Sequence, residues 1–385
     1  MAKQVAIIGA GASGLISIKC CLEEGLEPIC FERSDDIGGL WKFTETSGHG
    51  KTQVYKSVVT NVTKEMSCFS DFPFQEDYPN YMNHAKFLEY LRSYAKHFDL
   101  LKYIHLKTIV HSVTKCPDFS ATGQWEVVTE NEGKQDTAVF DAVMICTGFL
   151  LNPHFPLKSF PGINKFQGQI LHSQQYRSPE DFQEPTRSLC KNKIYLYKYV
   201  FPSNLEKPTM AIMGHISLKG ALFPGIELQG RWATRVFKGL CKIPPTNQLM
   251  AEATKKEQLI KRDIIMDPTK EKMDYITYLD ELAICIGAKP SILSLFLKDP
   301  RLGKEVFFGP CTSYQYRLTG PGKWDGARNA ILTQWDRTLK PLQTRIVADF
   351  SESSAVSHWL KIWGGASVLF FAVLLVYKVH EVNFV

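Results

Sequence analysis

Several common signals are missing from this sequence of 385 residues. No two of its ten cysteines stand in a C-x-x-C spacing, which argues against a zinc finger or a thioredoxin-like pair, and no metal site is expected. The net charge of +6 is spread along the chain without a long basic run, so nucleic-acid binding is not expected. No signal peptide precedes the first predicted strand. Reduced core thiols in a cytosol-facing protein fit these absences.

Long uncharged stretches are rare in the sequence, and one of them lies near its end. Hydrophobic residues make up 44% and charged residues 22%, as is typical of a folded globular protein. Residues 362–377 carry no charge, and sixteen helical residues at ~1.5 Å each fall slightly short of a bilayer core. Adding Trp359, Leu360 and a snorkelling Lys361 reaches spanning length. We predict a C-terminal membrane anchor over 359–378; the alternative is a buried core helix.

A glycine-rich turn near the start of the chain predicts a dinucleotide site. The turn consists of Gly9, Ala10, Gly11, Ala12, Ser13 and Gly14. It follows an apolar strand and opens a helical pattern, and Glu32 ends the next strand eighteen residues beyond Gly14. Gly9 permits a tight turn, Gly11 lets backbone N–H groups approach a pyrophosphate, and Gly14 lets helix and strand pack closely. We expect Glu32 to accept hydrogen bonds from an adenosine ribose; the alternative is an ordinary glycine-rich turn.

Two further stretches favour FAD over NAD at this site. A second glycine pair, with Gly39, Leu40 and Trp41 after Glu32, resembles the loop that runs under the flavin in FAD-binding proteins with two dinucleotide-binding domains. The sequence Cys-Thr-Gly at 146–148 is similar to the A-T-G motif of the same proteins. A helix near 84–98 and a strand–turn–strand pattern around Gly133 complete a layered α/β domain of Rossmann type.

A fingerprint then makes a family recognisable. Phe166, Gly168, His172 and Tyr176 match the F-x-G-x-x-x-H-x-x-x-[WYF] pattern of flavin-dependent N- and S-monooxygenases and Baeyer–Villiger relatives. His172 alone would more often be a structural residue. Long stretches such as "CCLEEGLEPICFERSDDIGGLWKF" and "FFGPCTSYQYRLTGPGKWDGARNAILTQWDR" closely resemble vertebrate flavin-containing monooxygenases. The resemblance covers nearly every residue except about 183–193.

The resemblance implies a cofactor cycle and a location. It implies FAD and NADPH as cofactors, a C4a-hydroperoxyflavin, O2, and amine or thioether substrates, including xenobiotics, oxygenated at a soft nitrogen or sulfur. It places Thr60, Asn61 and Val62 beside the flavin and nicotinamide, with Asn61 as the catalytic residue, because an amide donates and accepts without titrating. Without the resemblance, the local sequence predicts that Asn61 is a turn residue. The resemblance also implies an anchor in the lipid of the endoplasmic reticulum membrane, with the catalytic part facing the cytosol.

The NADPH-binding domain that the family carries after its fingerprint is missing from this sequence. Between Tyr176 and Tyr195 stand eighteen residues, whereas one βαβ unit needs ~30. Two later glycine-containing stretches lack the strand–turn–helix spacing, and Pro321 would interrupt a phosphate-binding turn. We expect the first part of the FAD-binding domain over 1–182, a junction over 183–193, the continuation of the FAD-binding domain over 194–350, and the anchor over 359–378.

Beyond the junction the FAD-binding domain is expected to resume. "KPTMAIMG" (207–214) predicts a strand, and "FPGIELQGRWATRVFKGL" (223–240) predicts a helix with Pro224 near its start. Three hypotheses follow: a flavin monooxygenase, a membrane-tethered FAD-binding remnant without useful turnover, or another FAD oxidoreductase that needs no NADPH. The fingerprint argues against the third. The missing glycine motif favours the second hypothesis for how the protein behaves. The first hypothesis still describes the family to which we assign it.

Overall fold

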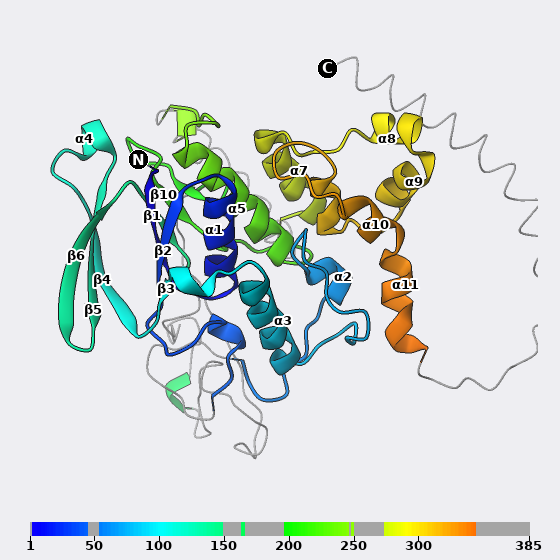
Figure 1. Ribbon diagram of the computed structural model, residues 1–385, viewed down its shortest axis with the longest axis horizontal. Coiled ribbons are helices and arrows are strands. Elements are labelled where there is room, and N and C mark those ends of the chain that lie inside the picture. The colour runs from blue at the N-terminus through cyan, green and yellow to red at the C-terminus, as the bar shows by residue number, and fades with distance from the viewer. Residues whose placement is uncertain are drawn as a thin grey trace, which may run out of the picture. The chain divides into compact units, whose positions relative to one another are not determined.

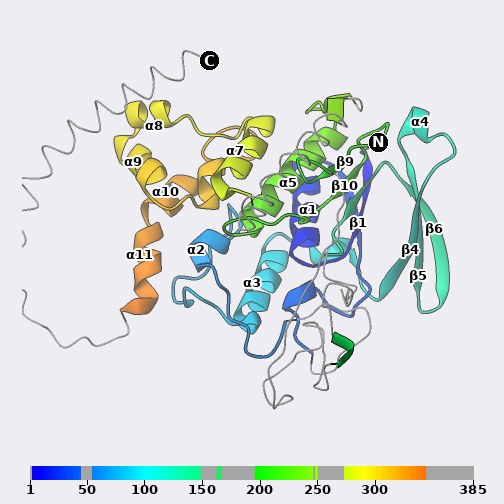
Figure 2. The same ribbon diagram turned by 180° about the vertical axis from the view of Figure 1, so that it is seen from behind.

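The chain is divided into two compact units, 1–341 and 342–385. The computed structural model describes the ranges 2–44, 54–148, 163–165, 196–245, 248–249 and 273–343. Nearly all of these residues belong to the first unit, whose arrangement is shown from two sides in Figures 1 and 2. The fold that follows is the fold of that unit.

A five-stranded sheet forms the centre of the unit. Its strands lie in the order β10 (Met210–Ile212), β7 (Ala142–Ile145), β1 (Gln4–Ile8), β2 (Glu27–Phe31) and β3 (Ile104–His105), and all neighbours are parallel. Residues Val5–Ile7 of β1 and Ala142–Met144 of β7 are buried, which explains the apolar runs in both strands, because helices or other layers cover both faces of a parallel sheet. The predicted α/β class with a parallel sheet is confirmed.

The strand predicted after the junction completes this sheet. Residues Met210, Ala211 and Ile212 of β10 pair in register with Val143, Met144 and Ile145 of β7. The chain segments before and after the predicted junction therefore belong to one sheet. The predicted strand over 207–214 is shorter in the structure but lies where it was expected.

A three-stranded antiparallel sheet stands beside the central sheet (Figure 1). It consists of β4 (Thr108–Lys115), β5 (Trp125–Asn131) and β6 (Lys134–Phe140). The turn between β5 and β6 places Glu132 and Gly133 at φ of 51° and 79°, and the predicted strand–turn–strand around Gly133 is confirmed. Its buried aromatic side chains form a second, smaller core with Phe31 of β2.

Two helices pack side by side against the central sheet. Helix α1 (Ala12–Glu23) follows β1, and helix α5 (Phe223–Phe237) follows β10. They approach closely where a Cβ on Gly230 would lie 3.2 Å from Cys20 Sγ. Helix α3 (His84–His97) begins at Asn83, whose side chain accepts a hydrogen bond from the Lys86 amide.

The remaining described elements are a hairpin, further helices and 3₁₀ turns. A hairpin pairs β8 (Leu196–Tyr197) with β9 (Phe201–Pro202). The other helices are α2 (Lys64–Ser67), α4 (Phe119–Thr122), α7 (Tyr275–Ile286), α8 (Ile292–Lys298), α9 (Pro300–Phe308), α10 (Ala327–Leu332) and α11 (Gln334–Leu339). Single 3₁₀ turns lie at Gly39–Trp41, Leu101–Tyr103, Ile163–Lys165, Ser313–Arg317 and Lys340–Leu342.

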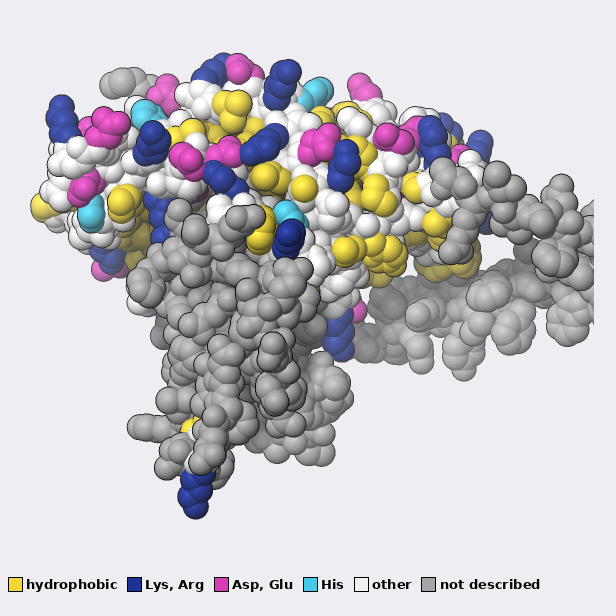
Figure 3. Space-filling view, turned by 90° about the horizontal axis from the view of Figure 1, so that it is seen from below, with side chains coloured by type: hydrophobic (Ala, Val, Ile, Leu, Met, Phe, Trp, Pro, Cys, Tyr) yellow, Lys and Arg dark blue, Asp and Glu magenta, His cyan; other side chains and the backbone are white. Residues whose placement is uncertain are grey.

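Among the helices of the described ranges, none has the length and apolar character that a membrane span requires. The anchor expected over 359–378 lies outside those ranges. On the face of the described part seen in Figure 3, Lys and Arg side chains alternate with Asp and Glu side chains.

Candidate functional site

The glycine turn between β1 and α1 is closely packed at two of its three glycines. Gly9 has φ of 101°, and a Cβ there would lie 2.8 Å from the Cys146 carbonyl oxygen. A Cβ on Gly14 would lie 1.9 Å from the Gly9 carbonyl oxygen, so helix and strand can meet only around a glycine. At Gly11 the nearest atom to a Cβ is Gly39 Cα at 3.6 Å. Gly9 and Gly14 are thus required by packing, whereas Gly11 leaves space beside the turn.

Glu32 lies at the end of β2 and connects this strand to the glycine turn. Its Oε2 accepts a hydrogen bond from the Ala10 amide at 2.7 Å, and its Oε1 accepts from the Ser34 amide and hydroxyl at 2.9 and 2.8 Å. The side chain is nearly buried but borders a cavity. Because a carboxylate offers about four lone-pair sites, it keeps capacity for a ligand hydroxyl.

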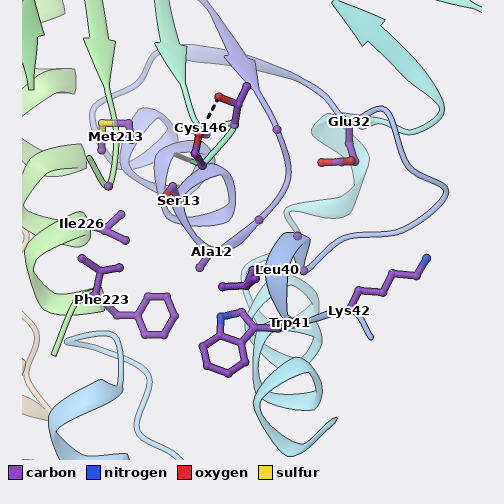
Figure 4. A pocket seen from close by; sticks show the side chains of 18 of the residues that line it. Ala12, Ser13, Glu32, Leu40, Trp41, Lys42, Cys146, Met213, Phe223 and Ile226 are labelled. Carbon is purple, nitrogen blue, oxygen red and sulfur yellow. Dashed lines mark hydrogen bonds between the residues drawn. The ribbon is translucent and has the colours of Figure 1, made fainter. Parts of the chain in front are cut away.

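An aromatic wall follows the second glycine pair. Gly38 and Gly39 take positive φ of 105° and 52°, which turns the chain back so that the Gly38 amide donates to the Ala10 carbonyl oxygen at 3.0 Å. The Trp41 indole then stacks on Phe87 of α3, with ring centroids 4.2 Å apart. Phe87 in turn stacks on Phe223 at the start of α5, at 5.0 Å. Figure 4 shows Trp41 and Phe223 bordering the same space.

Asn61 is held at the cavity by an ordered loop. The Thr60 amide donates to the Met82 carbonyl oxygen at 2.8 Å, and the Thr60 hydroxyl accepts from the Met82 amide at 2.9 Å. Lys64, fully buried, donates from Nζ to the carbonyl oxygens of Gln75, Glu76 and Tyr78 at 3.3, 2.7 and 2.9 Å. Sequence reasoning missed Lys64; a lone basic residue amid "NVTKEMSCF" gives no signal of such a role.

The predicted residues meet at one cavity of about 830 Å³, within the range of small-molecule sites. Among its lining residues are the predicted Gly9, Gly11, Ala12, Ser13, Glu32, Gly39, Leu40, Trp41, Thr60, Asn61 and Val62. Ala10 and Gly14 are not among them and act behind the wall, through the hydrogen bond to Glu32 and the close packing already described. Part of the opposite wall comes from Cys146, which belongs to the predicted Cys-Thr-Gly motif, and from Met213 and Ile226 (Figure 4). Gly214 and Leu222 also line the cavity.

Two helices begin at this cavity. Ala12 and Ser13 open α1, and Leu222 and Phe223 open α5; all four residues line the cavity. Helix N-termini carry partial positive charge and free N–H groups, which favour negative charge on a bound ligand. The Cys146 thiol in the wall stays neutral, because burial raises its pKa to about 12.

A cluster of charged residues is buried behind the cavity, between α1 and α5. Arg317, 1% exposed, contacts Glu227 of α5 at 2.9 Å, Glu23 of α1 at 3.2 Å, and Asp71 at 3.2 Å. Burial favours the neutral form of the Glu227 carboxyl, but the neighbouring Arg317, Arg231 and Lys19 charges outweigh it and lower its pKa. The sequence stretch "YQYRLTGPGKW" thus packs into the core through its arginine.

The remaining predicted residues lie outside the described ranges. These are Phe166, Gly168, His172 and Tyr176 of the fingerprint and the junction 183–193. Within the described ranges no group of three or more His, Cys, Asp or Glu side chains is arranged to hold a metal ion.

Comparison with known proteins identifies the family of this chain. The model of the flavin-binding monooxygenase-like family matches residues 2–187 and 182–378. The chain therefore belongs to this family, whose members are FAD- and NADPH-dependent oxidoreductases. It is 50% identical to human dimethylaniline monooxygenase [N-oxide-forming] 4, with 98% of this chain and 95% of the relative covered. It is 40% identical to human flavin-containing monooxygenase 2, with coverages of 96% and 98%.

Two features of these comparisons concern the length of the chain and the way the family model matches it. The alignment with the first human relative has 533 positions, whereas this chain has 385 residues, so at least 148 positions (533 less 385) are gaps in this chain. The two segments matched by the family model meet at 182–187.

Solved structures share the fold. S-allyl-L-cysteine S-oxygenase from Allium sativum superposes with a TM-score of 0.65 at 21% identity, covering 88% of this chain and 98% of its own. Tmm from a Pelagibacter strain gives a TM-score of 0.56 at 17% identity, with coverages of 72% and 83%. At these identities the likeness supports the fold alone.

Proposed function

We propose that this chain binds FAD in the cavity and, with NADPH and O2, oxygenates soft nucleophilic nitrogen or sulfur atoms of amines and thioethers, xenobiotics among them. Besides membership of the family, one observation supports this proposal most directly. The glycine turn around Gly11, the ribose-binding candidate Glu32 and the candidate catalytic Asn61 are far apart in sequence, yet they line the same cavity. The cavity volume and the space beside Gly11 both fit a dinucleotide.

Each group has a distinct part in this proposal. The N–H groups at the start of α1 and around Gly11 face the pyrophosphate, and Glu32 accepts hydrogen bonds from the ribose. The stacked rings of Trp41 and Phe87 exclude water from one side. FAD, when bound, supplies the hydride acceptor and the activation of O2. Asn61 orients the reacting groups through an amide that does not titrate.

We further propose that the NADPH-binding domain is largely absent, with the organisation 1–182, junction 183–193 and continuation 194–350. The gap of at least 148 positions against the human relative and the meeting of the matched segments at 182–187 support it. Without a phosphate-binding turn, NADPH is held by contacts at its nicotinamide end alone. We expect reduction to be slow and the electrons to end mainly in hydrogen peroxide, as in the alternative of a remnant with little turnover.

The proposed location is the endoplasmic reticulum membrane, with the catalytic part in the cytosol and 359–378 as a lipid-embedded anchor. The support is the uncharged run at 362–377, which approaches spanning length, together with the resemblance to the vertebrate enzymes. This range lies outside the described residues, so the support comes from the sequence.

The test compares the purified protein with the full-length human relative in the same assay. We expect a flavin absorption spectrum, NADPH-dependent peroxide formation, and kcat/KM for sulfoxide formation from a simple thioether at least ~10³-fold lower, equivalent to ~4 kcal/mol of transition-state stabilisation. A protein that retains no flavin would refute the cavity assignment. Sulfoxide formation at a comparable kcat/KM would refute the missing NADPH anchor.

A further inference from the structure

A hydrogen-bonded relay starts in the cavity wall at Gly214. This glycine follows β10, lines the cavity, and has φ of 75°. Its amide donates to Oε1 of Gln229 at 2.9 Å. Gln229 lies on α5 and is fully buried. Its amide oxygen accepts and its amide nitrogen donates, both within the protein.

The relay continues from Gln229 to the β8–β9 hairpin. Gln229 Nε2 donates to the Tyr278 hydroxyl at 2.8 Å, and that hydroxyl donates to the Lys198 carbonyl oxygen at 2.9 Å. Tyr278 is 3% exposed, and burial raises its pKa, so the hydroxyl keeps its proton. The three bonds run in one direction, from Gly214 to Lys198, because an amide and a hydroxyl can each accept and donate.

The hairpin at the far end of the relay has an unusual backbone. Lys198 and Tyr199 are consecutive non-glycine residues with φ of 45° and 60°, a region that L-residues avoid. Such conformations persist where surrounding contacts hold them. Here Gln229 Nε2 also reaches the Tyr199 carbonyl oxygen at 3.4 Å, and Lys198 Nζ pairs with Glu281 Oε2 at 3.2 Å.

The hairpin is outside the cavity but bonded to its wall. None of residues 196–202 is among the residues that line the cavity. A second contact accompanies the relay, since the Ile212 amide of β10 donates to the Val200 carbonyl oxygen at 2.8 Å. The hairpin is also the first described element after the segment where the two family matches meet.

We propose that Gln229 and Tyr278 are positioning residues that couple the β8–β9 hairpin to the flavin cavity through Gly214. Binding energies linked through one element act in both directions. A hairpin held in its left-handed turn fixes the Gly214 corner of the cavity, and FAD against that corner stabilises the hairpin. The inference rests on the proposed binding of FAD, and it concerns retention of the cofactor.

The first test removes one hydroxyl from the relay. In holoprotein, Tyr278→Phe is expected to raise backbone hydrogen exchange in peptides covering 196–202 and 210–216, and to speed FAD release on dilution by roughly 2–10-fold, the range for one net hydrogen bond. Tyr275→Phe is the matched control, because Tyr275 lies on the same helix, is buried, and donates to the Cys311 carbonyl oxygen at 3.3 Å. It is expected to leave both readouts unchanged.

The second test is a double-mutant cycle. Gln229→Met removes the hydrogen bonds of the amide to Gly214, Tyr278 and Tyr199 while keeping a side chain of similar length. It is expected to speed FAD release at least as much as Tyr278→Phe. Combining the two is expected to add nothing beyond Gln229→Met, because one link is already broken.

Three outcomes separate the possibilities. If exchange rises in 196–202 alone while FAD release is unchanged, Tyr278 has a merely structural role and the coupling is wrong. Additive effects of the two substitutions on release would overturn it as well. If wild-type protein binds no FAD, the failure belongs to the proposed function instead.

Discussion

The glycine turn allows cofactor binding and folding to be separated by two substitutions three residues apart. Gly11 has φ of −74°, ordinary for any residue, and a Cβ there meets Gly39 Cα at 3.6 Å, normal contact. Gly11→Ala should therefore keep the free energy of unfolding of the cofactor-free protein within about 1 kcal/mol, with a gain possible from the less flexible unfolded chain. Gly14→Ala would place its Cβ 1.9 Å from the Gly9 carbonyl oxygen, which we expect to cost about 3 kcal/mol.

The Gly11 substitution that barely changes stability is expected to weaken FAD binding. A methyl group at Gly11 occupies the space beside the turn through which the pyrophosphate approaches the backbone. We expect the Kd for FAD to rise at least ~10-fold with Gly11→Ala, or ~1.4 kcal/mol, and further with Gly11→Val. Denaturant unfolding and flavin titration of both variants measure the two quantities. Unchanged FAD affinity in Gly11→Val, or a loss of stability in Gly11→Ala equal to that of Gly14→Ala, would refute the reasoning.

Two further predictions concern the tail and the buried charges. Deleting 359–385 should move the protein toward the soluble fraction on cell fractionation, because the long uncharged segment is removed; unchanged membrane association would point to another lipid-binding surface. For Glu227, the folded pKa is lowered from an ordinary 4.5, so its contribution to stability is present above pH 4.5 and lost as pH falls through the folded pKa. Glu227→Gln should lower the unfolding free energy at neutral pH by roughly 3–5 kcal/mol and reduce its dependence on pH below 4.5. An unaltered acid limb in the variant would show that other groups govern it.

The local parts of the fold were predictable because their signals are local. The apolar run before Gly9, the alternation around Gly133 and the proline at the start of α5 each depend on a few neighbouring residues, and the structure has these elements where they were expected. The glycines at 9 and 14 were assigned to turn and packing from spacing alone, and the distances agree.

Contacts between distant segments were not predictable from spacing. Lys64 is satisfied by three carbonyl oxygens from a loop more than ten residues later, and nothing in its own sequence neighbourhood indicates burial. Arg317 stands 90 residues from Glu227, and their pairing depends on how the 3₁₀ turn Ser313–Arg317 packs against α5. The stretch around Pro321 lacks the spacing of a phosphate site in the sequence, and in the structure the Pro321 carbonyl oxygen accepts a hydrogen bond from Arg231 at 2.9 Å.

The topology of the central sheet is compatible with the proposed absence of the NADPH-binding domain. A parallel neighbour requires a crossover of a dozen or more residues, and 64 residues (146–209) separate β7 from β10. The sheet can therefore close without a domain inserted in that crossover. The predicted cofactor-binding residues from Gly9 to Val62 that line the cavity precede β7, the predicted Cys-Thr-Gly motif at 146–148 follows it directly, and part of the opposite wall comes from 213–226. Under the proposed organisation, retention of FAD and use of NADPH depend on different parts of the chain, and we expect a protein that binds flavin well and oxygenates poorly.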